Sequence, residues 1–204
     1  WRYRIAILTH WKFVVLFSLV SVVGFNVTFY LALQRTTALQ ATLIQSVLPA
    51  IVLLYGLVLC GERINGRQWL GVVLSVAGAG LIVIRGDLDV LQTLSLNGGD
   101  AWALVAVFMW GWQAFLMRYK PTDIPIMPFM TAISLVGVIG MSPLYAWETT
   151  HYRTMPVNET SILFVLYVGA IAGFVGTTCW NEGTYRAGPA QAGYFGNMYP
   201  IFAG

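Results

Sequence analysis

The chain has 204 residues, of which 58% are hydrophobic and 9% are charged, and its formal net charge is +3. Soluble domains carry about 25% charged residues, so this composition excludes an ordinary soluble domain and indicates a membrane protein. The few basic residues cluster between apolar stretches, so they indicate membrane topology and nucleic acid is not an expected partner.

Charged residues are absent from six long stretches, each close to the roughly 20 apolar residues that cross a bilayer as a helix. These predicted spans are residues 13–34, 36–61, 68–84, 101–117, 124–147 and 160–181. A seventh begins at Ala187 and reaches Gly204. The chain starts without methionine, in the basic stretch from Trp1 to Lys12. We therefore expect a fragment of a longer polytopic protein that lacks helices at both ends.

The connections between the spans differ in charge. If the segment before the first span is cytoplasmic, eight basic residues lie inside and three lie outside. The inside set is Arg2, Arg4, Lys12, Arg63, Arg67, Arg118, Lys120 and Arg186, and the outside set is Arg35, Arg85 and Arg153. Cytoplasmic loops of membrane proteins are enriched in Lys and Arg, so the sequence predicts this orientation.

The segment from Gly24 to Ala50 returns later in the chain with an offset of 186 − 35 = 151 residues. The identical pairs are Arg35 and Arg186, Gln40 and Gln191, Ala41 and Ala192, and Pro49 and Pro200. An odd number of spans, five, separates the copies, so the second copy enters the membrane upside down. Inverted repeats of this kind place a substrate site near the bilayer midplane.

The two repeated prolines, Pro49 and Pro200, lie inside spans, where proline removes a backbone hydrogen bond and kinks the helix. Such breaks survive in a membrane where protein or a watery cavity satisfies the freed carbonyl. The kinks therefore either border a substrate cavity or simply bend the helices.

Polar residues inside the spans are the candidates for cargo binding, because polarity within a membrane is costly and tends to serve function. The candidate set is Asn26, Tyr30, Gln45, Trp110, Gln113, Asn181, Tyr194 and Asn197. Asn26 and Tyr30 are four residues apart and so share a helical face. Aromatic walls with a few amides are typical of a pocket for a small, partly apolar solute. The competing interpretation is that these side chains only bond neighbouring helices.

Glu182 lies toward the cytoplasmic end of its span, in the sequence "CWNEG". One hypothesis makes it a proton-coupling acid, and the favoured one pairs it with Arg186, four residues on, as an ion pair at a helix end. The two cysteines, Cys60 and Cys179, lie in or near apolar spans and predict no disulfide framework. No metal or cofactor is expected.

Motifs along the chain are similar to those of a known family. They are "ALQRTTALQATLIQSVLPAIVLL", "LCGERINGRQWLGVVLSVAGAGLIV", "GDAWALVAVFMWGWQAFLMRY" and "CWNEGTYRAGPAQAGYFGNMYPIFAG". In the second motif, Glu62, Gln68, Trp69, Gly71 and Gly78 stand where the family carries its "GE…QW.G…GV" pattern. The chain therefore resembles the drug/metabolite transporter superfamily, specifically its EamA-type exporters of ten helices.

The resemblance implies an all-α polytopic membrane protein with an inverted-repeat transporter fold, in which this chain covers helices three to nine. Residues 1–86 would complete the first repeat, 87–99 would form a connecting loop, and 100–204 would form an incomplete second repeat. It further implies a multi-pass carrier of the bacterial inner membrane that works by alternating access.

The cargo is constrained by what the spans lack. No Lys or Arg lies in the middle of a span, so sugar phosphates and nucleotide sugars are not favoured. We expect export of a small neutral or zwitterionic metabolite, with an amino acid, preferably one with a large side chain, as the first hypothesis. A drug or another metabolite is the alternative. Expected partners are the cargo and the lipid bilayer, and a homodimer is left open.

Other classes of membrane protein have requirements of their own. An intramembrane enzyme would need a nucleophile and base or metal ligands within the spans, whereas His10 and His151 lie in connections. A channel would need a charged ring or a carbonyl filter, and neither is evident. A non-transporting helical membrane protein stays open, although it would not need an inverted repeat.

Overall fold

The computed structural model describes residues 3–63, 65–83, 98–151 and 156–195, and within them every regular element is a helix. The elements are α1 (Arg4–Thr9), α2 (Trp11–Ser18), η1 (Leu19–Gly24), α3 (Phe25–Leu33), α4 (Ala38–Gln45), α5 (Leu48–Cys60), α6 (Gly66–Val83), α8 (Gly98–Leu116), η2 (Met117–Tyr119), α9 (Ile126–His151), α10 (Glu159–Leu166), η3 (Tyr167–Gly176), α11 (Thr177–Ala187) and α12 (Pro189–Phe195). Helices satisfy all backbone polar groups within one segment, which is what a bilayer demands.

Five helical segments of the described chain are long and apolar enough to cross a membrane. They are Trp11–Leu33, Gln40–Cys60, Gly98–Tyr119, Ile126–His151 and Glu159–Ala187. Each matches one predicted span, and α6 occupies the predicted span 68–84. The all-helical, polytopic fold predicted from the sequence is thereby confirmed. The linker predicted at 87–99 lies almost wholly outside the described residues.

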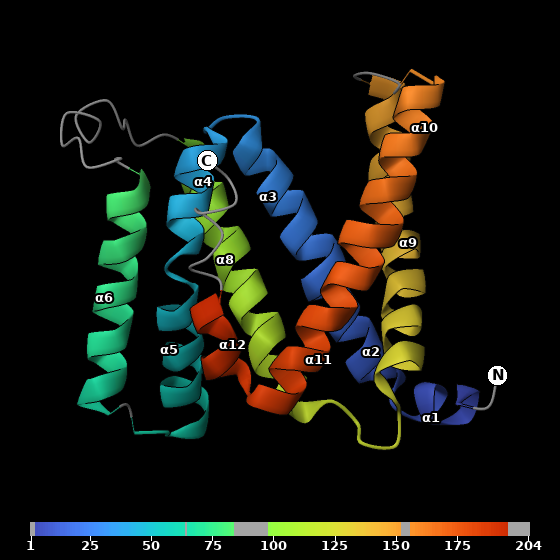
Figure 1. Ribbon diagram of the computed structural model, residues 1–204. Coiled ribbons are helices and arrows are strands. Elements are labelled where there is room, and N and C mark those ends of the chain that lie inside the picture. Colours follow the sequence, from blue (N-terminus) through green and yellow to red (C-terminus); the bar gives the residue numbers. More distant parts are fainter. Residues whose placement is uncertain (1–2, 64, 84–97, 152–155, 196–204) are drawn as a thin grey trace.

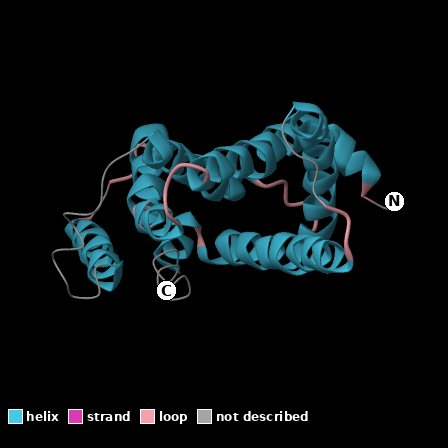
Figure 2. Cartoon of the chain, turned by 90° about the horizontal axis from the view of Figure 1, so that it is seen from above, coloured by secondary structure: helices cyan, strands magenta, loops and turns pink. Residues whose placement is uncertain are grey.

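The helices form an elongated assembly, with α6 at one end and α9 and α10, on opposite sides of the molecule, at the other (Figures 1 and 2). The last span tilts across the molecule, so that α10 overlaps α9 in Figure 1 but stands apart from it when seen from above in Figure 2, while α11 approaches α8 and α12. The connections after α5, α8 and α11 lie at the lower end in Figure 1, whereas the connection after α3 and the last turn of α9 lie at the upper end.

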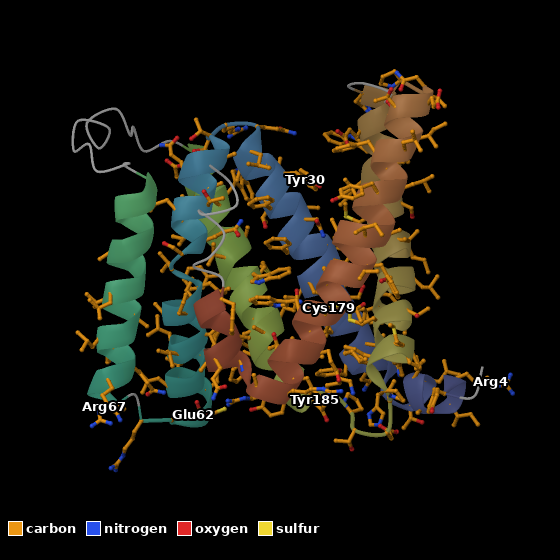
Figure 3. All side chains as sticks on the ribbon, in the orientation of Figure 1. Arg4, Tyr30, Glu62, Arg67, Cys179 and Tyr185 are labelled. Carbon is orange, nitrogen blue, oxygen red and sulfur yellow. The ribbon has the colours of Figure 1, made fainter. Side chains whose placement is uncertain are left out.

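Basic residues of the described chain gather at the lower end (Figure 3). Arg4 and Arg67 are labelled there, together with Glu62 and Tyr185. Arg35, in the connection between α3 and α4, lies at the opposite end. Among the described residues, Arg35 of the predicted outside set and the members of the predicted inside set therefore lie at opposite ends, while Arg2, Arg85 and Arg153 lie outside the described residues. By the positive-inside rule, we expect the lower end to be the cytoplasmic one, and we name it so.

The hairpins that carry the repeat enter from opposite faces. The joint between α3 and α4 is at the upper end, and the joint between α11 and α12 is at the lower end (Figure 1). The two short helices begin at equivalent positions, because 189 − 38 = 151 is the offset found in the sequence. The inverted relation predicted from the sequence is therefore present in the fold.

Both repeat-related spans contain a π-helical segment just before the hairpin. The segment η1 ends at Gly24 and η3 ends at Gly176, positions that differ by 176 − 24 = 152 residues, one more than the repeat offset. π-Helical turns are rare and occur often at functional sites. Their presence at matching places means that each copy of the hairpin starts from a locally widened helix.

The span Gln40–Cys60 is broken near its middle into α4 and α5. The break falls at Ser46 and Val47, and Pro49 lies in the first turn of α5, where a missing N–H is best tolerated. The kink predicted at Pro49 is thus present as a change between two half-helices. Gly193 of α12 lies against this break, since a Cβ added there would be 3.3 Å from Pro49 Cα. Pro200 lies outside the described residues.

Glycines allow the spans on either side of the centre to approach closely. A Cβ on Gly137 of α9 would lie 2.5 Å from Val22 Cγ1 of η1, and one on Gly111 of α8 would lie 2.7 Å from Ile51 Cγ2 of α5. Small residues at helix interfaces permit such contact between backbones. Consequently α8 is held between the first and second spans, with α3 packed along it.

Candidate functional site

A chain of polar contacts links three spans in the interior. Gln113 of α8 donates from Nε2 to Asn181 Oδ1 of α11 over 2.9 Å, and Asn181 Nδ2 lies 3.4 Å from Met130 Sδ of α9. Gln113 is 2% exposed and Asn181 is 1% exposed. Both amides are candidates from the sequence, and the structure brings them into direct contact.

Aromatic rings pack around this pair on the side of α3. The ring centroids of Phe25 and Trp110 are 4.5 Å apart, and those of Trp110 and Trp180 are 5.8 Å apart. Phe29 stacks on Phe25 at 5.5 Å. Because Trp110 and Gln113 are three residues apart on α8, and Trp180 and Asn181 are adjacent on α11, the rings and the amides meet at one crossing of spans.

A narrow crevice opens between the half-helix break and α8. It is lined by Phe25, Gln45, Leu48, Val107 and Trp110, whose side chains leave essentially no room for a water-sized molecule. Its walls are almost entirely apolar, as expected for a site that holds an amphiphilic solute by shape. Gln45 and Trp110, both predicted from the sequence, line it together.

Four buried side-chain polar atoms have no hydrogen-bond partner among the described residues, and three of them belong to residues at this crossing. They are Ser21 Oγ, Trp110 Nε1, Gln113 Oε1 and Trp180 Nε1. A buried group left unpaired costs about 1–3 kcal/mol, so an accumulation of such groups in one region is unfavourable unless another molecule completes it. We call the atoms of Trp110, Gln113 and Trp180 the unpaired triad. Sequence reasoning missed Trp180, whose only signal was its alignment with Phe29 in the repeat.

The remaining candidates from the first span are placed differently. Asn26 Nδ2 donates to the Val22 carbonyl of its own span over 2.7 Å, which satisfies the π-helical backbone. Tyr30 is 54% exposed, near the upper end of α3, with its ring against Phe29 (Figure 3). The shared helical face predicted for Asn26 and Tyr30 therefore does not carry Tyr30 into the crevice lining. The side chain of Tyr194 and the whole of Asn197 lie outside the described residues.

Glu182 forms the ion pair that its spacing suggested. Its Oε1 lies 2.5 Å from Arg186 Nη2 and 2.6 Å from Arg186 Nε, on the last two turns of α11. The carboxylate side chain is 29% exposed and the guanidinium side chain is 77% exposed. A role for Glu182 in proton coupling stays a prediction.

The cytoplasmic ends of α8 and α11 are joined through Lys120, which lies in the connection before α9. Its Nζ donates to the Ile124 carbonyl over 2.5 Å and lies 4.6 Å from the ring centroid of Tyr185. Burial lowers the pKa of the Lys120 amine, and the Glu182 and Asp123 carboxylates oppose that shift. This contact lies closer to the lower end of the bundle than the pair of Gln113 and Asn181, and it joins the same two helices, α8 and α11.

A second cytoplasmic contact joins α5 to α8. Gly61 ends α5 in the left-handed conformation, φ 64°, and the Glu62 N–H reaches back to the Gly56 carbonyl over 3.1 Å. This turn presents the Glu62 carboxylate to Arg118 Nη1 at 2.7 Å. The Gly-Glu pair of the sequence motif thus serves to fasten two spans at the membrane surface.

The described residues hold no group of three or more His, Cys, Asp or Glu side chains able to bind a metal ion. What the geometry defines instead is a polytopic helical membrane protein whose inverted hairpins meet around an uncharged, partly unpaired polar centre.

Comparison with known sequences agrees with this class. The sequence profile of the EamA-like transporter family matches residues 1–84 and 97–204, and the chain belongs to that family. It is 20% identical over 190 residues to the uncharacterized transporter YyaM of Bacillus subtilis, covering 92% of this chain and 61% of that protein. The inner membrane protein YtfF of Escherichia coli is 28% identical over 170 residues, covering 74% of this chain and 53% of its own.

A third relative, the uncharacterized inner membrane transporter YicL of Salmonella typhimurium, is 26% identical over 188 residues, or 91% of this chain and 60% of that protein. The chain therefore spans about 53–61% of the length of these three relatives. No solved structure matches the chain.

Proposed function

We propose that the full-length protein is a secondary carrier that exports a small neutral or zwitterionic metabolite across a bacterial inner membrane by alternating access. An amino acid is the preferred cargo. The observation that carries this proposal is the buried polar centre of Gln113 and Asn181, which joins α8 to α11 between two hairpins that enter from opposite faces. Inverted repeats with a central site are the usual architecture of carriers that rock around a bound solute.

The charge distribution supports an uncharged or zwitterionic cargo. In the described chain, each Lys and Arg lies in a connection or near a helix end, and the centre offers amides and indoles. A phosphate would meet no fixed positive charge there, and burying an unpaired anion is very costly. A zwitterion has no net charge and can satisfy donors and acceptors together.

The aromatic wall supports a cargo with an apolar part. Phe25, Trp110 and Trp180 present ring surface to the crossing, and their contacts at 4.5 and 5.8 Å leave only the narrow crevice beside them. The crevice leaves essentially no room for a water-sized molecule, whereas known ligand pockets hold at least roughly 300 Å³, so we assign this conformation to a closed state of the carrier. Cargo would enter when the hairpins separate.

The test uses the full-length protein in liposomes with radiolabelled phenylalanine, leucine and glycine offered in parallel. Saturable flux of phenylalanine above protein-free liposomes, reduced at least about tenfold by Trp110→Ala, is expected, because removing the ring forfeits the burial of a large apolar side chain. The exposed Trp69 provides the matched control, Trp69→Ala. Flux of another neutral solute without flux of any amino acid would retain the carrier and overturn the cargo.

A further inference from the structure

The donors and acceptors of the unpaired triad indicate which polar groups the cargo carries, which the fold alone does not. Gln113 Oε1 accepts hydrogen bonds, whereas Trp110 Nε1 and Trp180 Nε1 only donate them. We infer that Gln113 is a specificity-determining residue that reads a cationic donor, the ammonium group of an α-amino acid, while the two indole N–H groups read its carboxylate. This inference rests on the proposed function and adds the recognition of both charged groups to it.

The orientation of the Gln113 amide is fixed by its neighbours. The Met130 thioether accepts hydrogen bonds and cannot donate, so the Asn181 amide turns its NH₂ group toward the sulfur. Its oxygen then faces Gln113 and accepts from Nε2 at 2.9 Å. The Gln113 oxygen is the end left over, and it is buried without a partner in the described chain. Asn181 is therefore a positioning residue, which leaves an acceptor and not a donor of Gln113 unpaired in the interior.

The indole groups supply the opposite polarity at the same crossing. Trp110 and Trp180 come from different spans, yet their ring centroids are 5.8 Å apart and both N–H groups lack a partner among the described residues. Two donors from adjacent rings suit the two oxygens of a carboxylate. Hydrogen bonds in which one partner is ionised are about twice as strong as neutral ones, so neutral amides and indoles can hold a zwitterion firmly.

This arrangement makes a specific prediction about selectivity. A solute that carries a carboxylate but lacks the ammonium group would leave the Gln113 oxygen buried and unpaired. A solute that carries the ammonium but lacks the carboxylate would leave the indoles unpaired. Each loss lowers affinity by about 10- to 100-fold, since a site built to bond a group rejects the analogue that lacks it.

The experiment measures equilibrium binding by calorimetry on the purified full-length protein in nanodiscs. The probes are phenylalanine, 3-phenylpropionate, which lacks the ammonium group, and phenethylamine, which lacks the carboxylate. The wild-type protein is expected to bind phenylalanine at least about tenfold more tightly than either analogue. Gln113→Met should reduce the preference over 3-phenylpropionate to about twofold and leave the preference over phenethylamine in place.

The indole variants should give the opposite pattern. Trp110→Phe combined with Trp180→Phe keeps the rings and removes both donors, so the preference over phenethylamine should fall while that over 3-phenylpropionate stays. Asn181→Leu should weaken the preference over 3-phenylpropionate although it leaves Gln113 Oε1 in the protein. Gln113→Glu, which keeps an acceptor at this position, should show the preference over 3-phenylpropionate that Gln113→Met loses. Gln191→Met and Trp69→Phe, the same chemical changes at exposed positions, should alter neither preference.

Two results would overturn the inference, and each has its own signature. If Gln113→Met weakens all three probes by the same factor, while Gln113→Glu does not restore the preference, the amide only packs. If the wild-type protein binds phenylalanine no more tightly than its analogues, the triad reads neither group. Failure of the wild-type protein to bind any probe would contradict the proposed cargo, and the inference would fall with it.

Discussion

The buried amide pair allows a quantitative test of the interior. Replacing Asn181 by leucine removes the acceptor for Gln113 Nε2 and leaves both polar atoms of that amide unpaired at 2% exposure. An unpaired buried group costs about 1–3 kcal/mol, whereas interhelical hydrogen bonds measured in a membrane protein average about 0.6 and reach about 1.7 kcal/mol. Because neither water nor lipid reaches this pair, we expect a coupling near about 1.5 kcal/mol.

The measurement is a double-mutant cycle on the free energy of unfolding in mixed detergent micelles. Asn181→Leu and Gln113→Met are each expected to cost about 2 kcal/mol, and the double variant should be less destabilised than their sum by about 1.5 kcal/mol. Replacing both partners by apolar groups of similar size removes the unpaired atoms as well as the bond. Additive single costs, within about 0.3 kcal/mol, would refute the reasoning.

Three further predictions concern topology, packing and proton coupling. Cys60, exposed at the lower end of α5, should react with a membrane-impermeant maleimide in inside-out vesicles and not in right-side-out ones, and the reverse pattern would invert the orientation. Gly137→Val should lower the free energy of unfolding by about 1–3 kcal/mol, because a Cβ would lie 2.5 Å from Val22 Cγ1. At Gly183 an added Cβ meets nothing within 4 Å, so the control Gly183→Ala should be nearly neutral, and thermal unfolding measures both variants. Glu182→Gln should leave flux driven by a proton gradient within about twofold of wild type, because the carboxylate is held in an exposed ion pair. Loss of the response to the gradient would assign Glu182 to coupling.

The positions of the spans were predictable because charge marks their ends. Arg35 separates the first two spans, and Arg118 with Lys120 ends the span that contains α8. The inverted hairpins were predictable because Arg35 and Pro49 recur at a constant offset. These signals show where the chain can cross a bilayer. Burying a charged residue in the membrane is costly whatever the helices pack against, so charged residues mark the ends of the spans.

The composition of the site was only partly predictable. Gln113 and Asn181 were found because an amide within a span stands out by its polarity. Met130 and Trp180 were missed, since a thioether or an indole in an apolar span has the same pattern whether it packs or binds. Tyr30 was assigned to the site from its spacing to Asn26, but the direction of a helical face depends on how α3 rests on α8, and no local pattern encodes that contact.

The π-helical segments were not predictable, because the widened turn depends on tertiary packing and no residue type specifies it. In the structure η1 packs against α8 and α9, and Gly24 brings its backbone close to Met109, since a Cβ there would be 3.3 Å from the Sδ atom. The sequence predicted bends at the prolines only. The bend at Pro49 is present, and the π-helical segments η1 and η3 are further irregularities that the sequence did not predict.

The matching irregularities in the two inverted hairpins have a consequence for energy balance. Because both hairpins begin from a widened turn, a shape that one copy adopts is accessible to the other. If the full-length protein works by the proposed alternating access, exchanging the two shapes would convert a structure open to one side into a structure open to the other, with interior packing of similar extent. Under the alternating-access mechanism that we propose, the two forms should be close in free energy, so that a difference in cargo affinity of only a few kcal/mol would be enough to reverse their populations.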